Sequence, residues 1–381
     1  MGSTQSSLMR LLLAGAALAP VAAAPEPAGA QGVTGAVLDS ATAAPLPGVL
    51  VEALDADGTR VGATLSDAAG RFTIRLNAPG RYRARAERIG LRTATTEWIE
   101  VAGSELRATR IAMSGRAVRI EGFVVDSRVR ECRLDGGQAV RIQSLWDEIR
   151  KALEISLVVQ RERLIAFRIE SIRREWSADL GSISADTTVV GVGRSEHPYV
   201  SAGAELLLGG GFVQGEPGQR RFYGPDANVL LSDEFLFAHC FSLADTDDGA
   251  GVVDTDDRAG VVGLTFEPLP SREVPDIAGT LWVDTATAEL EHLEYRYVGL
   301  QWLPPHEGGG RVTFSHLPSG AWIVSDWYIR MPRVGLVRGP ESPIEVSVIA
   351  GYVDVGGRVH PLTTPEGLPR GDRARTPGSP R

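Results

Sequence analysis

Short segments in which hydrophobic and polar residues alternate dominate residues 31–113. The clearest examples are GVTGAVLD at 32–39, GRFTIRL at 70–76 and GRYRARAER at 80–88. Glycine, proline, aspartate or asparagine stands at each break between segments, as tight turns between strands require. Successive side chains of a strand point to opposite faces, so the alternation indicates strands buried on one side. The regular turn spacing predicts a β-sandwich of about seven strands over residues 31–115.

The spacing between hydrophobic residues is different in residues 144–160, which read SLWDEIRKALEISLVVQ. Leu145, Ile149 and Leu153 lie four residues apart and form one apolar stripe, which predicts an α-helix. Ser144 is the expected N-cap residue of this helix. We expect the stripe to pack on a β-sheet.

Long strands are predicted on the C-terminal side of this helix. Single strands are predicted at 161–177, 228–244 and 261–268. Two hairpins follow at 279–300 and 309–332, and a last strand is predicted at 344–355. Turn-forming residues at 284–287 and 318–320 divide the two hairpins. The pattern predicts an antiparallel β-meander packed with one α-helix over residues 118–355, in which an open half-barrel is one arrangement of the sheet. The chain is thus expected to be mainly β.

The composition of the chain excludes some classes of binding partner. Hydrophobic residues make up 43% of the chain, which is enough to build a buried core. The formal net charge is −9, and an acidic surface repels nucleic acid and anionic membranes, so no nucleic-acid partner is expected. Residues 356–381 are rich in proline, glycine and arginine and are predicted to be a disordered tail.

Residues 1–30 have the layout of a secretory signal peptide. Arg10 precedes an apolar stretch at 11–19, and an A-x-A-like site at 28–30 precedes Gln31. The apolar stretch is shorter than the roughly 20 residues that span a bilayer, although an uncleaved N-terminal anchor is the alternative. We therefore expect an exported protein, periplasmic or extracellular, with no transmembrane segment after signal cleavage.

The chain contains two cysteines, Cys132 and Cys240. An even number of cysteines in an exported protein predicts a disulfide between them. Such a bond would close a long loop, for which the chain-entropy relation gives a stabilisation of roughly 4–5 kcal/mol. Two separate buried thiols are the alternative.

Several short motifs of the first domain carry a family resemblance. They are GxVxD at 35–39, PLPGVxV at 45–51, SDAAGRF at 66–72, GxY at 80–82, and Gly90. This set resembles the carboxypeptidase regulatory-like domain, a transthyretin-like β-sandwich that is grouped with carbohydrate-binding-like folds. The resemblance implies a non-catalytic module of the kind found beside peptidases, receptors and secreted binding proteins.

The hairpin sequence GTLWVDTATAEL at 279–290 resembles the hairpins of lipoprotein-carrier proteins of the bacterial envelope. Those proteins hold an acyl chain or a hydrophobic peptide on the concave face of an open half-barrel. The resemblance implies a ligand surface lined by six aromatic residues, Trp282, Tyr295, Tyr297, Trp322, Trp327 and Tyr328. The alternative is that these side chains simply fill the space between the helix and the sheet.

No established catalytic or metal-binding motif is present. The chain lacks a G-x-S-x-G elbow, an H-E-x-x-H helix and the glycine-rich nucleotide loops, and none of its histidines precedes a glutamate by three residues as in zinc carboxypeptidases. The carboxylate pair Glu289 and Glu291, and His239 beside Cys240, are interpreted as surface residues. No catalytic residue, metal or cofactor is therefore expected.

An acidic tandem, DTDDGAGVV followed by DTDDRAGVV, occupies residues 245–262. It lacks the glycine at the sixth position of a calcium loop, so we interpret it as a duplication that lengthens a surface loop. Weak calcium binding by Asp245, Asp247, Asp254 and Asp256 is the alternative.

These observations predict an exported, non-catalytic binding or scaffold protein of the bacterial cell envelope. Its partner is an unidentified protein, a carbohydrate bound by the sandwich, or a hydrophobic ligand such as a lipid or acyl chain carried by the second domain. An enzyme is the third alternative, and carboxylates or histidines clustered in a pocket would be its sign.

Overall fold

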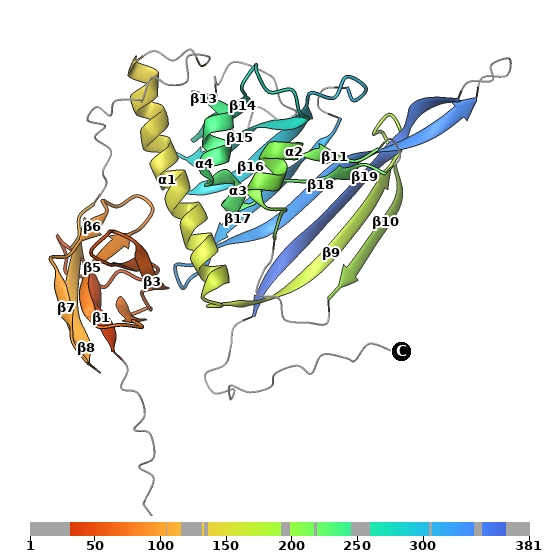
Figure 1. Cartoon of the computed structure of the whole chain (residues 1–381). Helices are drawn as coiled ribbons and strands as arrows, with labels where there is room; N and C mark the ends of the chain where they lie inside the picture. Colours follow the sequence, from red (N-terminus) through yellow and green to blue (C-terminus); the bar gives the residue numbers. More distant parts are fainter. Residues whose placement is uncertain are drawn as a thin grey trace, which may run out of the picture.

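The computed structural model describes residues 31–103, 105–115, 132, 136–191, 199–216, 219–244, 260–304, 307–338 and 345–362. A small β-sandwich is followed by a large antiparallel sheet whose one face is covered by helices (Figure 1). The predicted class, a sandwich joined to a β-meander with a packed helix, is therefore confirmed.

Two sheets form the sandwich in the described part of residues 32–113. One sheet has the order β4-β1-β8 and the other the order β3-β2-β5-β6, with β7 also paired to β5. The strands are β1 (Gly32–Asp39), β2 (Leu50–Leu54), β3 (Arg60–Leu65), β4 (Arg71–Arg75), β5 (Gly80–Glu87), β6 (Ala94–Thr95), β7 (Ile99–Val101) and β8 (Leu106–Met113). The sandwich thus has eight strands, against the seven expected. Phe72 and Tyr82 are buried between the sheets, as the alternation around them requires.

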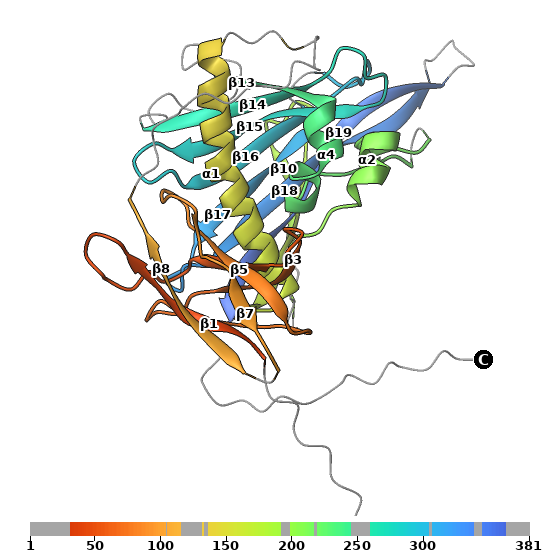
Figure 2. The same cartoon turned by 60° about the vertical axis from the view of Figure 1, so that its left-hand side comes forward.

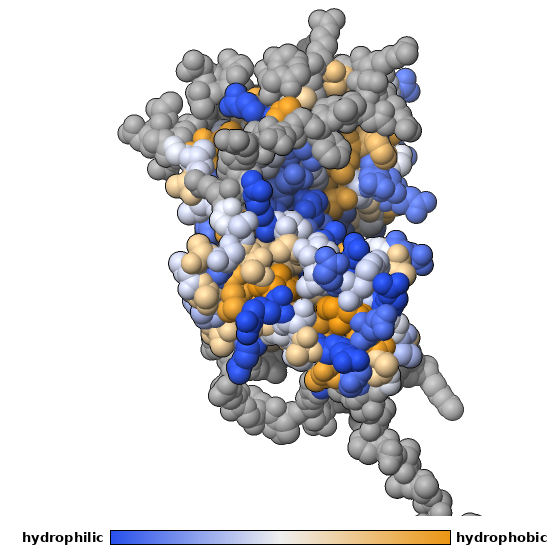
Figure 3. Space-filling model, turned by 90° about the vertical axis from the view of Figure 1, so that its left-hand side faces the viewer, coloured by the Kyte–Doolittle hydropathy of each residue, from blue (hydrophilic) through white to orange (hydrophobic). Residues whose placement is uncertain are grey.

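The outer face of the sandwich mixes hydrophilic and hydrophobic residues in small patches (Figure 3). Strand β4 accounts for hydrophilic residues on the surface, because its exposed residues Arg71, Thr73 and Arg75 are polar and the hydrophobic residues between them are buried. Alternation of this kind leaves polar side chains on the solvent side of each strand.

The second domain is one nine-stranded antiparallel sheet in the described residues, with the order β10-β9-β19-β18-β17-β16-β15-β14-β13. The strands of this sheet are β9 (Ala166–Trp176), β10 (Ile183–Val190), β13 (His239–Leu243), β14 (Val261–Pro268), β15 (Asp276–Asp284), β16 (Leu290–Val298), β17 (Gly309–His316), β18 (Trp322–Arg338) and β19 (Glu345–Leu362). Strands β11 (Val213–Gln214) and β12 (Arg221–Phe222) pair separately. Both predicted hairpins, β15–β16 and β17–β18, are present.

Four helices lie on one face of this sheet (Figures 1 and 2). They are α1 (Gly136–Arg161), α2 (Ala204–Gly210), α3 (Ala227–Leu230) and α4 (Asp233–Ala238). Helix α1 lies between the sheet and the sandwich, so its second half is buried nearly all round, and Ile149 and Leu153 are fully buried. The prediction of Ser144 as N-cap was wrong, because α1 begins at Gly136 and contains Ser144.

The segment 228–244 differs from its prediction as one strand. Its first half forms α3 and α4, and only its last part forms β13. The side chains of Asp226 and Ser232 cap the two helices by accepting hydrogen bonds from Val229 N and Phe235 N. Short apolar runs fit a helix or a strand equally well, and here the capping residues decide.

The boundary predicted for the tail, residue 356, is wrong, and residues 363–381 of the predicted tail lie outside the described residues. Strand β19 continues to Leu362 because its last residues pair with β9, up to the Leu362–Ala166 pair. Residues 356–362 are therefore part of the sheet.

A disulfide joins Cys132 to Cys240, with 5.5 Å between the two Cα atoms, as predicted. It ties the chain that precedes α1 to β13, which is one of the two edge strands of the sheet. Among the described residues, no helix is long and apolar enough to cross a membrane.

Candidate functional site

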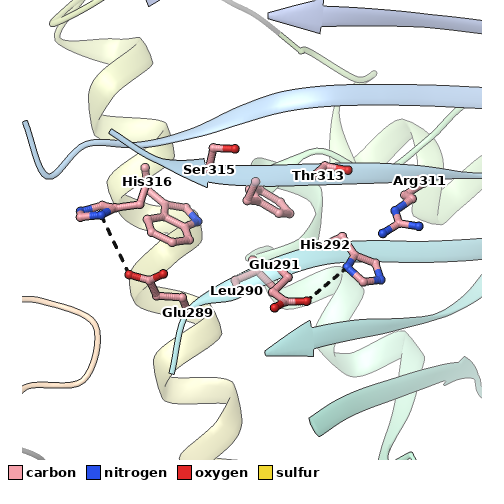
Figure 4. A pocket seen from close by; sticks show the side chains of 10 residues that line it. Glu289, Leu290, Glu291, His292, Arg311, Thr313, Ser315 and His316 are labelled. Atoms are coloured by element: carbon pink, nitrogen blue, oxygen red, sulfur yellow. Dashed lines mark ion pairs between the residues drawn. The ribbon is translucent and has the colours of Figure 1, made fainter. Parts of the chain in front are cut away.

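A pocket of about 260 Å³ lies where strands β16 and β17 separate (Figure 4). The two strands pair from His292–Thr313 to Arg296–Gly309, yet β16 begins at Leu290 and β17 continues to His316. The side chains that line the pocket come from these two strands, from the residue before β16 and from the start of β18: Glu289, Leu290, Glu291, His292, Arg311, Thr313, Phe314, Ser315, His316 and Trp322.

Two β-bulges accompany this separation. The register between β15 and β16 shifts after the Trp282–His292 pair, which leaves Glu291 as an extra residue on β16. The register between β17 and β18 shifts after the Thr313–Asp326 pair, which leaves Ser325 as an extra residue on β18. Bulges bend strands and redirect side chains, and they are common beside functional sites.

His292 is one of the residues that line the pocket, and its side chain is only 15% exposed. Its Nδ1 lies 3.9 Å from Glu291 Oε2, and its Nε2 lies 3.7 Å from Glu294 Oε1. Burial, together with the positive charge of Arg311, lowers the pKa of His292 to about 4. Its imidazole is therefore neutral near pH 7.

The carboxylates of the pocket differ in environment. Burial and the negative charge of Asp284 raise the pKa of Glu291, against the opposing charge of Arg311. Glu289 lies at the rim, where its Oε1 is 4.0 Å from Nδ1 of the half-exposed His316 (Figure 4). Glu289 and Glu291 are surface residues, as predicted, with side chains 39% and 43% exposed, and they also line the pocket together with two histidines.

Two buried hydrogen-bond donors of the pocket have no partner among the described residues. They are Nε1 of Trp322, a residue that is 3% exposed, and Nε of Arg311. The Nη1 atom of Arg311 donates to Glu294 Oε1 at 3.1 Å, so part of this guanidinium is already used. A buried donor without a partner costs free energy. Both atoms have less than 1 Å² of accessible surface, so they lie behind the pocket wall.

The turns on both sides of the pocket contact the sandwich. The turn between β17 and β18 places Gly320 so close to Gly48 that a Cβ atom on Gly48 would lie 2.1 Å from Gly320 Cα. The turn between β15 and β16 places the carbonyl of Thr287 beside Gly90, where a Cβ atom would lie 3.4 Å from that oxygen. The sandwich therefore contacts both chain segments that border the site.

The structure does not bring the six predicted ligand-binding aromatics together on one concave surface. Tyr295 and Tyr297 are buried in the core on the helix side of the sheet, and Trp327 stacks near Tyr199 with 4.9 Å between ring centroids. Trp322 lines the pocket between β16 and β17. Trp282 alternates with the buried Leu281 and Val283, and Tyr328 alternates with Trp327 and Ile329, which pack against the core, so Trp282 and Tyr328 point to the opposite face.

His239 is buried, not a surface residue as predicted. Its ring stacks on Phe235 with 4.0 Å between centroids, and its Nδ1 lies 2.9 Å from the Phe235 carbonyl oxygen. Its Nε2 lies 3.4 Å from Asp276 Oδ1, and Arg272 also pairs with Asp276. This group belongs to the core. Throughout the described ranges, no three histidine, cysteine, aspartate or glutamate residues gather as a metal site would require. Residues 245–259 of the acidic tandem lie outside the described residues.

His292, Arg311 and His316 were missed by the sequence analysis. Glu291 and His292 were adjacent on a predicted strand, but the bulge that brings both to the pocket leaves no mark in the sequence. Arg311 and His316 lie on the next hairpin, so only the pairing of β16 with β17 places them at the site.

No curated protein matches the chain. Among solved structures, the chain is similar to a 9R-lipoxygenase from Cyanothece with 13% sequence identity and a TM-score of 0.19. The match covers 91% of this chain and 44% of the lipoxygenase chain, so this chain spans less than half of that protein's length. That TM-score is too low to carry an argument about fold or function. Residues 32–114 match the model of the carboxypeptidase regulatory-like domain family. This part of the chain is a domain of that family.

Proposed function

We propose that this protein is an exported, non-catalytic binding and scaffold protein of the bacterial cell envelope. The carboxypeptidase regulatory-like domain serves as a support, and the pocket between β16 and β17 is the binding site. The observation that carries the proposal is the contact of the sandwich with both turns that border this pocket, through Gly48 with Gly320 and Gly90 with Thr287.

Polar contacts between the sandwich and α1 support this role. Gly90 N donates to Glu148 Oε2 at 2.7 Å, and Lys151 Nζ donates to the Leu91 carbonyl oxygen at 3.0 Å. Arg150 of α1 pairs with Glu87 of β5 at 3.2 Å, and Glu87 is 2% exposed. A buried ion pair fixes geometry more than it stabilises, and it strongly penalises any arrangement that leaves one charge unpaired.

Apolar packing supports a fixed junction as well. Leu50 of the sandwich is fully buried and belongs to the core of the second domain. Ala63, Leu65 and Ile89 of the sandwich pack against the same core. Domains joined mainly by polar surfaces usually move relative to one another, whereas an apolar junction opposes such motion.

Carriage of a hydrophobic ligand is less well supported by the side chains between the helices and the sheet. Phe167, Phe212, Phe235, Phe266 and Tyr352 are fully buried and pack in this region. Their burial favours the interpretation that aromatic side chains fill the space between the helices and the sheet and leave no room there for a ligand.

A carbohydrate on the sandwich is also less well supported. Trp98 is the only tryptophan of the sandwich, and a sugar would need its ring face. The guanidinium carbon of Arg83 lies 4.2 Å from the ring centroid of Trp98, and that of Arg81 lies 5.3 Å from it. The guanidinium groups of these two arginines therefore already cover part of the Trp98 ring.

Export is tested by expressing the full chain in a bacterium and measuring the intact mass of the protein in each cell fraction. We expect a periplasmic or secreted protein that begins at Gln31. An Ala30→Glu variant should remain uncleaved, because the cleavage site requires a small residue. A cytosolic protein that retains residues 1–30 would contradict export.

The supporting role is tested by hydrogen exchange in a Glu148→Ala variant of the full chain. Losing the acceptor of Gly90 N should speed amide exchange in the turn at 284–289, because Gly90 would no longer be held beside Thr287. Glu162→Ala removes an exposed carboxylate just beyond α1 and serves as the control. Equal exchange in this turn for both variants would contradict the supporting role.

A further inference from the structure

Strand β5 of the sandwich carries a row of arginines on one face. Arg81, Arg83 and Arg85 alternate with Tyr82 and Ala84, which are buried in the core of the sandwich, so the three arginines point to the outer side. Side chains two residues apart on a strand lie roughly 7 Å from each other. The outer face of β5 therefore presents several guanidinium groups at close spacing.

The three arginines differ in their negative partners. Arg85 Nη2 lies 2.6 Å from Oε2 of the buried Glu52, so Arg85 is firmly paired. Arg81 Nε lies 3.8 Å from Glu100 Oε1, but both side chains are more than half exposed, so water screens this attraction. Arg83 forms no ion pair or side-chain hydrogen bond with any other described residue, and its Nε is buried without a partner. Arg83 is thus the arginine of this row whose charge is not balanced.

Trp98 holds two of these guanidinium groups in place. The guanidinium carbon of Arg83 lies 4.2 Å from the ring centroid of Trp98, and that of Arg81 lies 5.3 Å from it. Arg83 is half-buried, and of its three nitrogens only Nε is closed to solvent, so the two terminal nitrogens can donate at the surface. A stacked guanidinium loses little further conformational freedom when it binds an anion.

Two positive charges beside one ring repel each other, and an anion bound between them would remove this repulsion. A phosphate group carries about 1.5–2 negative charges at pH 7 and three acceptor oxygens. The two terminal nitrogens of an arginine match two such oxygens with parallel hydrogen bonds. A carboxylate has the same fit to one arginine, but its single charge would balance only one of the two.

We propose that Arg83 and Arg81, held by Trp98, bind one phosphate group. The terminal nitrogens of Arg83 donate to two of its oxygens, and Arg81 supplies the second positive charge. The phosphate is a free ion or a phosphate monoester, and both present the same oxygens. This site lies on the sandwich, apart from the pocket between β16 and β17, and so goes beyond the proposed function.

The test uses the uniformly ¹⁵N-labelled mature chain with its disulfide intact. The indole N–H signal of Trp98, assigned with a Trp98→Phe variant, is followed while sodium phosphate or glycerol 3-phosphate replaces sodium chloride at constant ionic strength. We expect this signal to move and to saturate. Arg83→Gln removes the paired donors and should weaken binding roughly tenfold or more. Arg83→Lys keeps the charge without the planar fork, so its affinity should lie between the two.

Arg75→Gln is the matched control. Arg75 is an exposed arginine of β4, which belongs to the other sheet of the sandwich, so this variant loses the same charge from the same domain. Its affinity for phosphate should be unchanged. If Arg83→Gln does not fold, Arg81→Gln replaces it, since Arg81 is exposed, and its loss should weaken binding several-fold.

Each outcome decides the inference. Movement that saturates, is lost in Arg83→Gln and persists in Arg75→Gln supports the site; tighter binding of glycerol 3-phosphate then indicates an ester, and tighter binding of inorganic phosphate indicates the free ion. Equal affinity for acetate, titrated in the same way, would overturn the assignment to phosphate. Movement without saturation up to about 50 mM, where even a millimolar ligand saturates, or an equal response of Arg83→Gln and Arg75→Gln, would overturn the site. Neither result would touch the proposed support of the pocket.

Discussion

Replacement of Gly48 by alanine tests the contact between the sandwich and the turn that borders the pocket. Gly48 has a φ of +67°, and its Cβ atom would lie 2.1 Å from Gly320 Cα, 2.6 Å from Gly320 C and 2.7 Å from Gly320 O. All three atoms belong to backbone, which cannot rotate away. Ordinary contacts begin at 3.4 Å, so the two chain segments must separate or distort.

Gly58 offers a matched control within the same sandwich. Its φ is +80°, and a Cβ atom added there would meet nothing within 4 Å. Either substitution forces an alanine into the left-handed region, which costs roughly 1–2 kcal/mol. Only Gly48→Ala adds an overpacked contact, and such contacts cost typically about 1–3 kcal/mol. The free energy of unfolding should therefore fall by about 1–3 kcal/mol more in Gly48→Ala than in Gly58→Ala.

Urea unfolding of the oxidised mature chain, followed by tryptophan fluorescence, measures this difference. Gly320→Ala should resemble Gly48→Ala, because a Cβ atom on Gly320 would lie 2.0 Å from Gly48 Cα. The double variant should lose less than the sum of the single losses, since one broken contact cannot be broken twice. Equal losses in Gly48→Ala and Gly58→Ala would refute the contact.

The disulfide, the partly buried His292 and the packed core each allow a further test. Replacing both Cys132 and Cys240 by serine should lower the free energy of unfolding by roughly 4–5 kcal/mol in urea, and non-reducing peptide mapping should recover one linked peptide pair; two free thiols in native protein would disprove the bond. His292 has a folded-state pKa of about 4, below the unfolded value near 6.5, so the unfolded chain binds more protons between these values and stability should fall as the pH drops from 6.5 to 4. A His292→Gln variant should lose part of that slope, and an imidazole that titrates near pH 6.5 by NMR would contradict this expectation. Native mass spectrometry of the protein from its own envelope fraction should give the bare polypeptide mass; an added mass that organic extraction removes would favour the hydrophobic-carrier alternative.

The elements that could be predicted from the sequence are those whose signals are local. The β15–β16 and β17–β18 hairpins follow from alternation on both sides of a short turn, as at 284–287. The sandwich follows from turn motifs at fixed spacing. The helix was found in the part where its apolar stripe is regular, but its start at Gly136 was not.

The elements and contacts that could not be predicted depend on distant parts of the chain. Strand β19 extends to Leu362 only because β9, far earlier in the sequence, pairs with it. The contact of Gly48 with Gly320 joins two domains and leaves no periodic signal. The pocket depends on two register shifts and on the end of the β16–β17 ladder, and register is a property of paired strands. Glu289 and Glu291 could therefore be noticed in the sequence without their pocket being predicted.

In this account, the sandwich and the large sheet form one fixed unit around the pocket. The most direct measurement is the distance distribution between two spin labels, on cysteines introduced at the exposed positions Asp57 of the sandwich and Val189 of β10, in protein that retains its native disulfide. One narrow distribution, unchanged by temperature within the folded range, is the predicted result. A broad distribution, or several separate distances, would mean that the sandwich moves independently and does not support the pocket.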